Sequence, residues 1–168
     1  MAGNRKPRKQ YRPKPVLNPI VVVGENIRPV ASHTGYLMDL RLGNSSAMAA
    51  LLQGHATKQD MDRIIAMSNI VYALMETKFG NEYDELAKQA RIAIISIAHR
   101  ATTVGRFVPT GPEIKALNDL LELHDAQMDA ITVQDMDRAI DFARRKERNA
   151  TRLPVGYLKG TDPNEKLT

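Results

Sequence analysis

Between Tyr83 and Ala101 the sequence has the periodicity of one long amphipathic helix, and this stretch constrains the fold most strongly. Apolar residues recur at steps of three and four, which places them on one helical face. Ile92 and Ile95 widen that face, as is typical of a helix covered from more than one side. Charged residues interrupt the stretch, and it falls short of the roughly 20 apolar residues of a membrane span. We therefore predict the central helix of a soluble helical domain. The periodic positions are Tyr83, Leu86, Ala87, Ala90, Ile94, Ile97, Ala98 and Ala101.

Helix-start signals recur on both sides of this stretch. A Thr is followed three positions later by an acid, the pattern of a capping box in which each side chain binds a backbone N–H near the other. Glycine and proline mark the helix ends. We predict an all-α bundle built on the antiparallel helices 58–78 and 82–103, covered by helices 112–130 and 133–149. The capping pairs are Thr57–Asp60, Thr110–Glu113 and Thr132–Asp135.

Shorter elements are predicted before the first long helix. Residues 36–42 favour one short helix ended by Gly43, and residues 44–52 favour a second, stopped by Gly54. The β-branched runs 20–23 and 27–30 can form a short β-ribbon, which their prolines restrict to an edge. An extended apolar segment laid over the helical body is the alternative interpretation of these runs.

Two of the helix starts resemble each other. Residues 57–65 and 132–140 share the pattern T-x-Q-D-M-D-R and match at seven of nine positions. Capping explains the Thr and the first Asp but not the Gln, Met, second Asp and Arg. The similarity ends after the first turn, and two copies are too few for a solenoid. We interpret it as two similar helix starts, with a true repeat as the alternative.

The net charge of +5 is unevenly distributed. Residues 1–15 contain six basic and no acidic residues, residues 16–143 contain 11 basic and 16 acidic, and residues 144–168 contain seven basic and three acidic. The sequence thus divides into a proline-rich basic arm (1–19), an acidic helical domain (20–149) and a tail (150–168). The high isoelectric point of about 9.6 comes from the two ends.

The basic ends are the candidate binding sites. Proline and like charge disfavour helix and central strand in the arm, so it is predicted to be extended. Such a segment is either a solvated end or an arm that becomes ordered on an anionic partner. The basic run near residue 146 also suits the C-terminal end of a helix dipole. The candidate nucleic-acid-binding residues are Arg5, Lys6, Arg8, Lys9, Arg12, Lys14, Arg144, Arg145, Lys146 and Arg148.

Catalytic signatures are absent from the sequence. There is no cysteine, which excludes disulfides and thiolate chemistry, and there is no nucleotide-binding loop or zinc-protease motif. Glu122, His124, Asp125 and Asp129 form the best cluster, either a site for a hard cation or a solvated stripe opposite the leucines. We predict a protein that is not an enzyme, with no cofactor and no metal site.

Two stretches resemble sequences of small helical proteins from tailed phages and prophages. They are the arm segment Tyr11-Arg12-Pro13-Lys14-Pro15-Val16 and residues 116–127, Ala-Leu-Asn-Asp-Leu-Leu-Glu-Leu-His-Asp-Ala-Gln. Proteins of that kind pair a basic proline-rich arm with a helical body. The resemblance implies a viral or prophage origin, action in the host bacterial cytoplasm and a non-enzymatic accessory role.

Two functions are compatible with this sequence. The first is binding of DNA or RNA through the basic ends, without sequence preference. The alternative is an adaptor or inhibitor that binds a host or phage protein through its acidic body. No membrane partner is expected. Apolar surface left on the helix from Pro112 or on residues 20–30 would support a homodimer.

Overall fold

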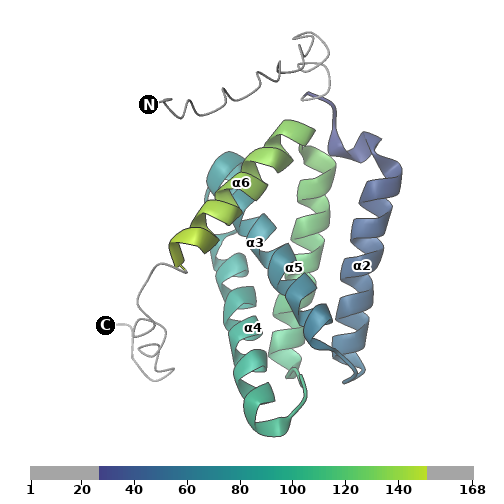
Figure 1. Cartoon of the computed structure of the whole chain (residues 1–168), viewed down its shortest axis with the longest axis vertical. Helices are drawn as coiled ribbons and strands as arrows, with labels where there is room; N and C mark the ends of the chain where they lie inside the picture. The colour runs from purple at the N-terminus through teal and green to yellow at the C-terminus, as the bar shows by residue number, and fades with distance from the viewer. Residues whose placement is uncertain (1–26, 151–168) are drawn as a thin grey trace, which may run out of the picture.

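The computed structural model describes residues 27–150, and within that range every regular element is helical. The chain packs as a bundle in which α6 lies across one end of the longer helices (Figure 1). The predicted all-α bundle is thus confirmed. The elements are η1 (Val30–Ser32), α2 (Thr34–Leu52), α3 (Lys58–Leu74), the π-helical turn η2 (Met75–Phe79), α4 (Asp84–Val104), α5 (Gly111–Ala130) and α6 (Val133–Ala150).

Helix α3, rather than α4, is the central element of the bundle. It contacts α2, α4, α5 and α6, whereas α4 packs mainly against α3 and α5. The predicted inward face of α4 is correct at Ile94 and Ile97, which are buried. It is wrong at Tyr83, which precedes α4 and is 41% exposed, and at Ala98, which is also exposed. Ile92 and Ile95 remain 48% and 65% exposed, so the prediction of a helix covered from more than one side is wrong. Helix α4 lies at the edge of the bundle, where one face meets its neighbours (Figure 1).

Helix α2 is one continuous helix where the sequence predicted two. Gly43 does not end it, and the helix continues to Leu52. A Cβ atom at Gly43 would lie 2.5 Å from Nη1 of Arg63, a residue of α3. Tertiary packing therefore accounts for this glycine, because the absence of a side chain at Gly43 leaves room for the Arg63 guanidinium. From the sequence alone, a glycine at this position indicates only the end of a helix.

The segment before η1 runs along the junction between α5 and α6. Pro29 and Thr132 form an isolated antiparallel β-bridge. The Val30 N–H donates to the Ile131 carbonyl at 3.0 Å, and the Val133 N–H donates to the Arg28 carbonyl at 2.9 Å. Residues 28–30 therefore follow the alternative interpretation, an extended segment against the helical body. Residues 20–23 lie outside the described range.

The predicted capping pairs are present at all three helix starts. The Thr57 N–H donates to Asp60 at 2.8 Å, and the Asp60 N–H donates back to the Thr57 hydroxyl. The Thr110 N–H donates to Glu113, and the Thr132 N–H donates to Asp135. At the two similar helix starts, after Thr57 and after Thr132, a Met in the first turns is also buried.

The buried methionines explain part of the T-x-Q-D-M-D-R similarity. Met61 and Met136 are both in core positions, 3% and 8% exposed. Each belongs to the same apolar cluster as the residue before the capping Thr, which is Ala56 before α3 and Ile131 before α6. Two apolar residues that bracket a cap in this way form a hydrophobic staple. The shared Met therefore has a local structural role at each helix start.

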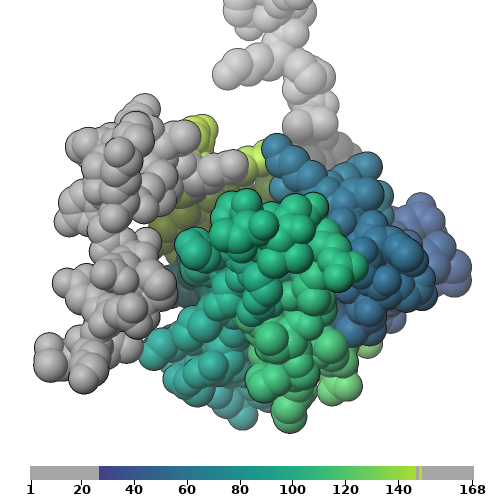
Figure 2. Space-filling model, turned by 90° about the horizontal axis from the view of Figure 1, so that it is seen from below, coloured from purple at the N-terminus to yellow at the C-terminus, as the bar shows by residue number. Residues whose placement is uncertain are grey.

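Two apolar clusters hold the bundle together. The larger cluster lies among α2, α3, α4 and α5, and includes Leu51, Ile64, Ile97 and Leu120. The smaller lies where η1 and α6 meet the ends of α3 and α5. Figure 2 views the bundle from the end opposite α6 and shows the teal-green connection after α4 beside the blue connection after α2. Figure 1 shows that α6 begins at the opposite end of the bundle from these two connections.

Candidate nucleic-acid interface

The four cations predicted near the end of the last helix occupy its exposed surface. They form the α6 patch: Arg144, Arg145, Lys146 and Arg148. No carboxylate among the described residues forms an ion pair with the first three. Their charge is therefore available to an anionic partner. The predicted binding residues Arg5, Lys6, Arg8, Lys9, Arg12 and Lys14 lie outside the described range.

Helix α6 is fixed to the bundle mainly through its first half. Met136 and Ala139 are buried against the ends of α3 and α5. Asp135 accepts from the Thr132 N–H and from Lys78 Nζ at 2.5 Å, which joins α6 to η2. Although burial alone would raise it, these hydrogen bonds lower the pKa of Asp135 to about 2. The carboxylate is therefore ionised at neutral pH and holds α6 in place.

A chain of aromatic and cationic contacts extends the α6 patch onto two other helices. Lys146 Nζ lies 5.3 Å from the centre of the Phe142 ring. The Phe142 and Tyr72 ring centres are 6.3 Å apart, and the Arg91 guanidinium lies 5.3 Å from the Tyr72 ring. Cation–π contacts at such distances contribute about 0.5–1 kcal/mol each at exposed sites. The rings therefore position Arg91 of α4 and Lys146 of α6 on one surface.

Sequence reasoning missed Tyr72, Arg91 and Phe142 as parts of this surface. Tyr72 and Arg91 are 19 positions apart and meet only because α3 and α4 fold back on each other. Phe142 stands four residues before Lys146, so this one pair follows the helical spacing that brings side chains together. That spacing was the only signal in the sequence that could have found it.

Acidic residues limit the positive surface. A hydrogen bond from the Tyr72 hydroxyl to Glu76, together with burial, raises the pKa of Tyr72, so the phenol stays neutral. Glu76 thus places a carboxylate at the edge of the aromatic pair. Asp137 and Asp141 are exposed along the first half of α6. The positive surface therefore consists of the last turns of α6 and the neighbouring Arg91.

The carboxylate cluster on α5 forms ion pairs with an arginine. Arg41 Nη2 lies 2.8 Å from Asp129, and Arg41 Nε lies 3.4 Å from Asp125. His124 is 1% exposed, and burial lowers the pKa of its imidazole, so it is neutral at pH 7. No group of three potential metal ligands occurs among the described residues. The two aspartates thus link α5 to α2, a role that neither sequence interpretation anticipated.

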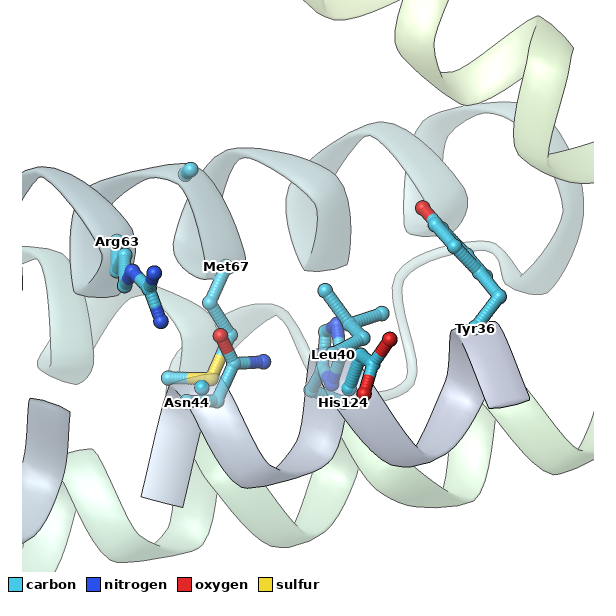
Figure 3. A pocket seen from close by; sticks show the side chains of 9 residues that line it. Tyr36, Leu40, Asn44, Arg63, Met67 and His124 are labelled. Carbon is cyan, nitrogen blue, oxygen red and sulfur yellow. The ribbon is translucent and has the colours of Figure 1, made fainter. Parts of the chain in front are cut away.

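A cleft of about 330 Å³ lies beside this cluster, between α2, α3 and α5. Figure 3 shows Arg63 of α3 and Asn44 of α2 directed toward its interior, with His124 of α5 behind Leu40. A single cation and the carboxylate of Asp39 line it, together with apolar side chains. Its mixed charge makes it a poorer anion site than the α6 patch.

None of the helices in residues 27–150 is long and apolar enough to cross a membrane. Comparisons with protein-family models, with curated proteins and with solved structures found no match for this chain.

Proposed function

We propose that this protein is a non-enzymatic accessory protein, of the tailed-phage or prophage kind, that binds DNA or RNA in a bacterial cytoplasm. The observation that carries the proposal is the α6 patch, where exposed Arg144, Arg145 and Lys146 lack carboxylate partners among the described residues. Cations of this kind neutralise phosphates and release the counterions condensed on them. Binding would be largely independent of base sequence, because phosphate contacts position a protein without specifying bases.

The surface around the patch supports the same partner. Arg91 adds a cation from α4, and Tyr72 holds it at 5.3 Å. The rings contact each other and the two cations, so we assign them a positioning role and no role in stacking on bases. The arm residues 5–14 would add phosphate contacts beyond the bundle. An anion that follows this surface would contact α4 and α6 together.

Fluorescence anisotropy of a labelled duplex across a salt series tests the proposal. If about six phosphates are neutralised, the slope of log affinity against log salt is near −5 on duplex DNA. Deletion of residues 1–15 should flatten the slope while the circular dichroism spectrum is retained. The double variant Arg144→Glu/Arg145→Glu should weaken binding and flatten the slope by about 2.

The matched control changes the same charge at the other end of the bundle. Lys58 and Arg106 are exposed and stand in or beside the connections after α2 and α4, at the end of the bundle opposite the start of α6 (Figure 1). Lys58→Glu/Arg106→Glu should leave the salt slope unchanged. Equal losses in the two double variants would mean that only net charge matters. That result would reject the α6 patch as the binding site. No binding at low salt would favour the alternative, a protein partner of the acidic body.

A further inference from the structure

The outward face of α2 carries a stripe of apolar and small residues with the spacing of a coiled-coil seam. We call it the α2 seam: Met38, Leu42, Ser45, Ala49 and Leu52. Successive members are four, three, four and three residues apart, which is the 3.5-residue repeat of two helices packed along their length. All five are exposed, Met38 and Leu42 by 68% and Leu52 by 48%. In this chain nothing among the described residues covers them.

The core does not require this stripe. Helix α2 buries a different face against α3 and α5, formed by Leu37, Ala47, Met48 and Leu51. Figure 1 places α2 at the edge of the bundle, so its outer face points away from the other helices. A surface helix normally carries polar and charged residues on that face. The second stripe of α2 is therefore not part of the core that stabilises the fold.

Charge is almost absent from α2. Asp39 and Arg41 are the charged residues among its 19 positions, and both stand beside the seam rather than in it. Arg41 is already engaged by Asp125 and Asp129 of α5. A groove of about 460 Å³, lined in part by Met38 and Leu42, runs along the seam. Arg41 and Asp129, which form an ion pair with each other, also line this groove. Exposed apolar surface that borders a groove is typical of an interaction site.

We propose that a second copy of this chain packs its own α2 against the α2 seam, antiparallel about a two-fold axis near Ser45. In that register each Leu42 lies opposite the small Ala49 of the other copy, and each Met38 lies opposite Leu52. Large side chains thus meet small ones at the centre, as interlocked helices require. The seam is self-complementary, which is the condition for a closed two-fold dimer.

The helix dipoles, rather than Asp39, favour the antiparallel arrangement over the parallel one. In a parallel pair the two Asp39 side chains would lie on opposite sides of the contact. In the antiparallel pair the two carboxylates are about 18 Å apart along the helix axis, at 1.5 Å per residue. Each Asp39 then lies near the uncharged Gln53 of the other copy. The antiparallel pairing also opposes the two helix dipoles, which is favourable.

The proposed interface is small. Helix α2 is about 28 Å long at 1.5 Å per residue, and a two-helix contact of that length buries less than the roughly 800 Å² per partner of a standard interface. We therefore expect a dissociation constant in the micromolar range. The surface differs from the one predicted on the helix from Pro112, because α5 exposes polar residues such as Lys115, Asn118 and Glu122.

Sedimentation equilibrium of the full chain without nucleic acid tests the dimer separately from the proposed function. The mass should rise toward that of a dimer between about 5 and 500 μM. Leu42→Glu should remain a monomer with an unchanged thermal midpoint. Ile95→Glu, which alters an equally exposed residue on α4, is the matched control and should dimerise normally. A monomer throughout the concentration range overturns the proposal, and so does a dimer that Leu42→Glu leaves intact.

Cross-linking tests the orientation, since the chain has no cysteine of its own. Met38→Cys mixed with Leu52→Cys should form a mixed disulfide dimer under mild oxidation. Met38→Cys alone should cross-link poorly, because its copies are far apart in the antiparallel register. Efficient cross-linking of Met38→Cys alone would show parallel helices and overturn the two-fold antiparallel arrangement.

Discussion

At the scale of single residues, the same substitution should have opposite effects at two glycines. Gly43 is inside α2 and has a helical backbone, so alanine there should raise stability by about 0.5–1 kcal/mol. The Cβ would displace only the far end of the flexible Arg63 side chain. Gly105 ends α4 at φ 75°, so Gly105→Ala should cost about 1–2 kcal/mol. Urea unfolding midpoints of the two variants check both signs. A loss of stability in Gly43→Ala would contradict the prediction, because it would mean that the Arg63 side chain cannot move aside at little cost.

The isoleucines of α4 test which face of the helix is buried. Ile97→Ala removes a fully buried side chain and should cost about 2–5 kcal/mol. Ile94→Ala should fall in the same range, since Ile94 is 7% exposed. Ile95→Ala, at 65% exposure, is the control and should change stability by less than about 0.5 kcal/mol. Thermal unfolding followed by circular dichroism measures all three. Equal losses at Ile95 and Ile97 would show that the assigned face is wrong.

Residue-level inferences from sequence succeeded where the interaction is local. The Thr57–Asp60 pair spans three positions, so its cap could be read directly from the chain. The exposure of Ile95 could not be predicted in this way, because it depends on which helices surround α4. The contact between Arg91 and Tyr72 depends likewise on how two helices fold back on each other.

At the scale of elements, Asp135 is the residue that couples the start of α6 to η2. Asp135→Asn keeps the size of the side chain but removes its charged hydrogen bonds, which should cost about 1.5–3 kcal/mol at pH 7. Asp137→Asn, which changes an exposed residue on the same helix, should have an effect below about 0.5 kcal/mol. Chemical denaturation of both variants measures the difference.

The pH dependence follows from the same carboxylate. Its pKa in the folded protein is about 2, below the ordinary value of 3.8. A depressed folded-state pKa contributes stability that is complete above about pH 4 and is lost as the pH falls toward 2. The difference in unfolding free energy between the wild-type protein and Asp135→Asn should therefore shrink over that range. A difference that stays constant from pH 7 to pH 2.5 would contradict the assigned hydrogen bonds.

The boundaries of the longer helices could be predicted because caps and glycines are local signals. Helices predicted at 112–130 and 133–149 are observed as Gly111–Ala130 and Val133–Ala150. The break predicted at Gly43 failed because the packing of α3 on α2, rather than local propensity, accounts for that glycine. Similarly, η2 extends the first long helix by a π-helical turn that apolar spacing does not indicate.

At the scale of the whole molecule, the arrangement of the helices in space could not be predicted from the periodicity of the sequence. The sequence placed the helix around Ile94 at the centre, but α3 has the most neighbouring elements. An amphipathic pattern indicates that one face of a helix is buried, but it does not indicate how many helices pack against that face. The α6 residues of the candidate interface could be named from the sequence. Tyr72 of α3 and Arg91 of α4 could not, because their contact depends on which helices lie side by side.

The bridge between Pro29 and Thr132 fixes where the chain enters the bundle relative to its basic end. The segment that follows the arm is held at the first residue of α6, and the α6 patch lies at the other end of that helix. The patch residues stand 11 to 15 positions after the first residue of α6, so the two points are about 17–23 Å apart. On a duplex this span corresponds to about five to seven successive phosphates of one strand, at 3.4 Å each. In the proposed complex, the binding footprint would therefore begin at about six base pairs and grow with the reach of the arm.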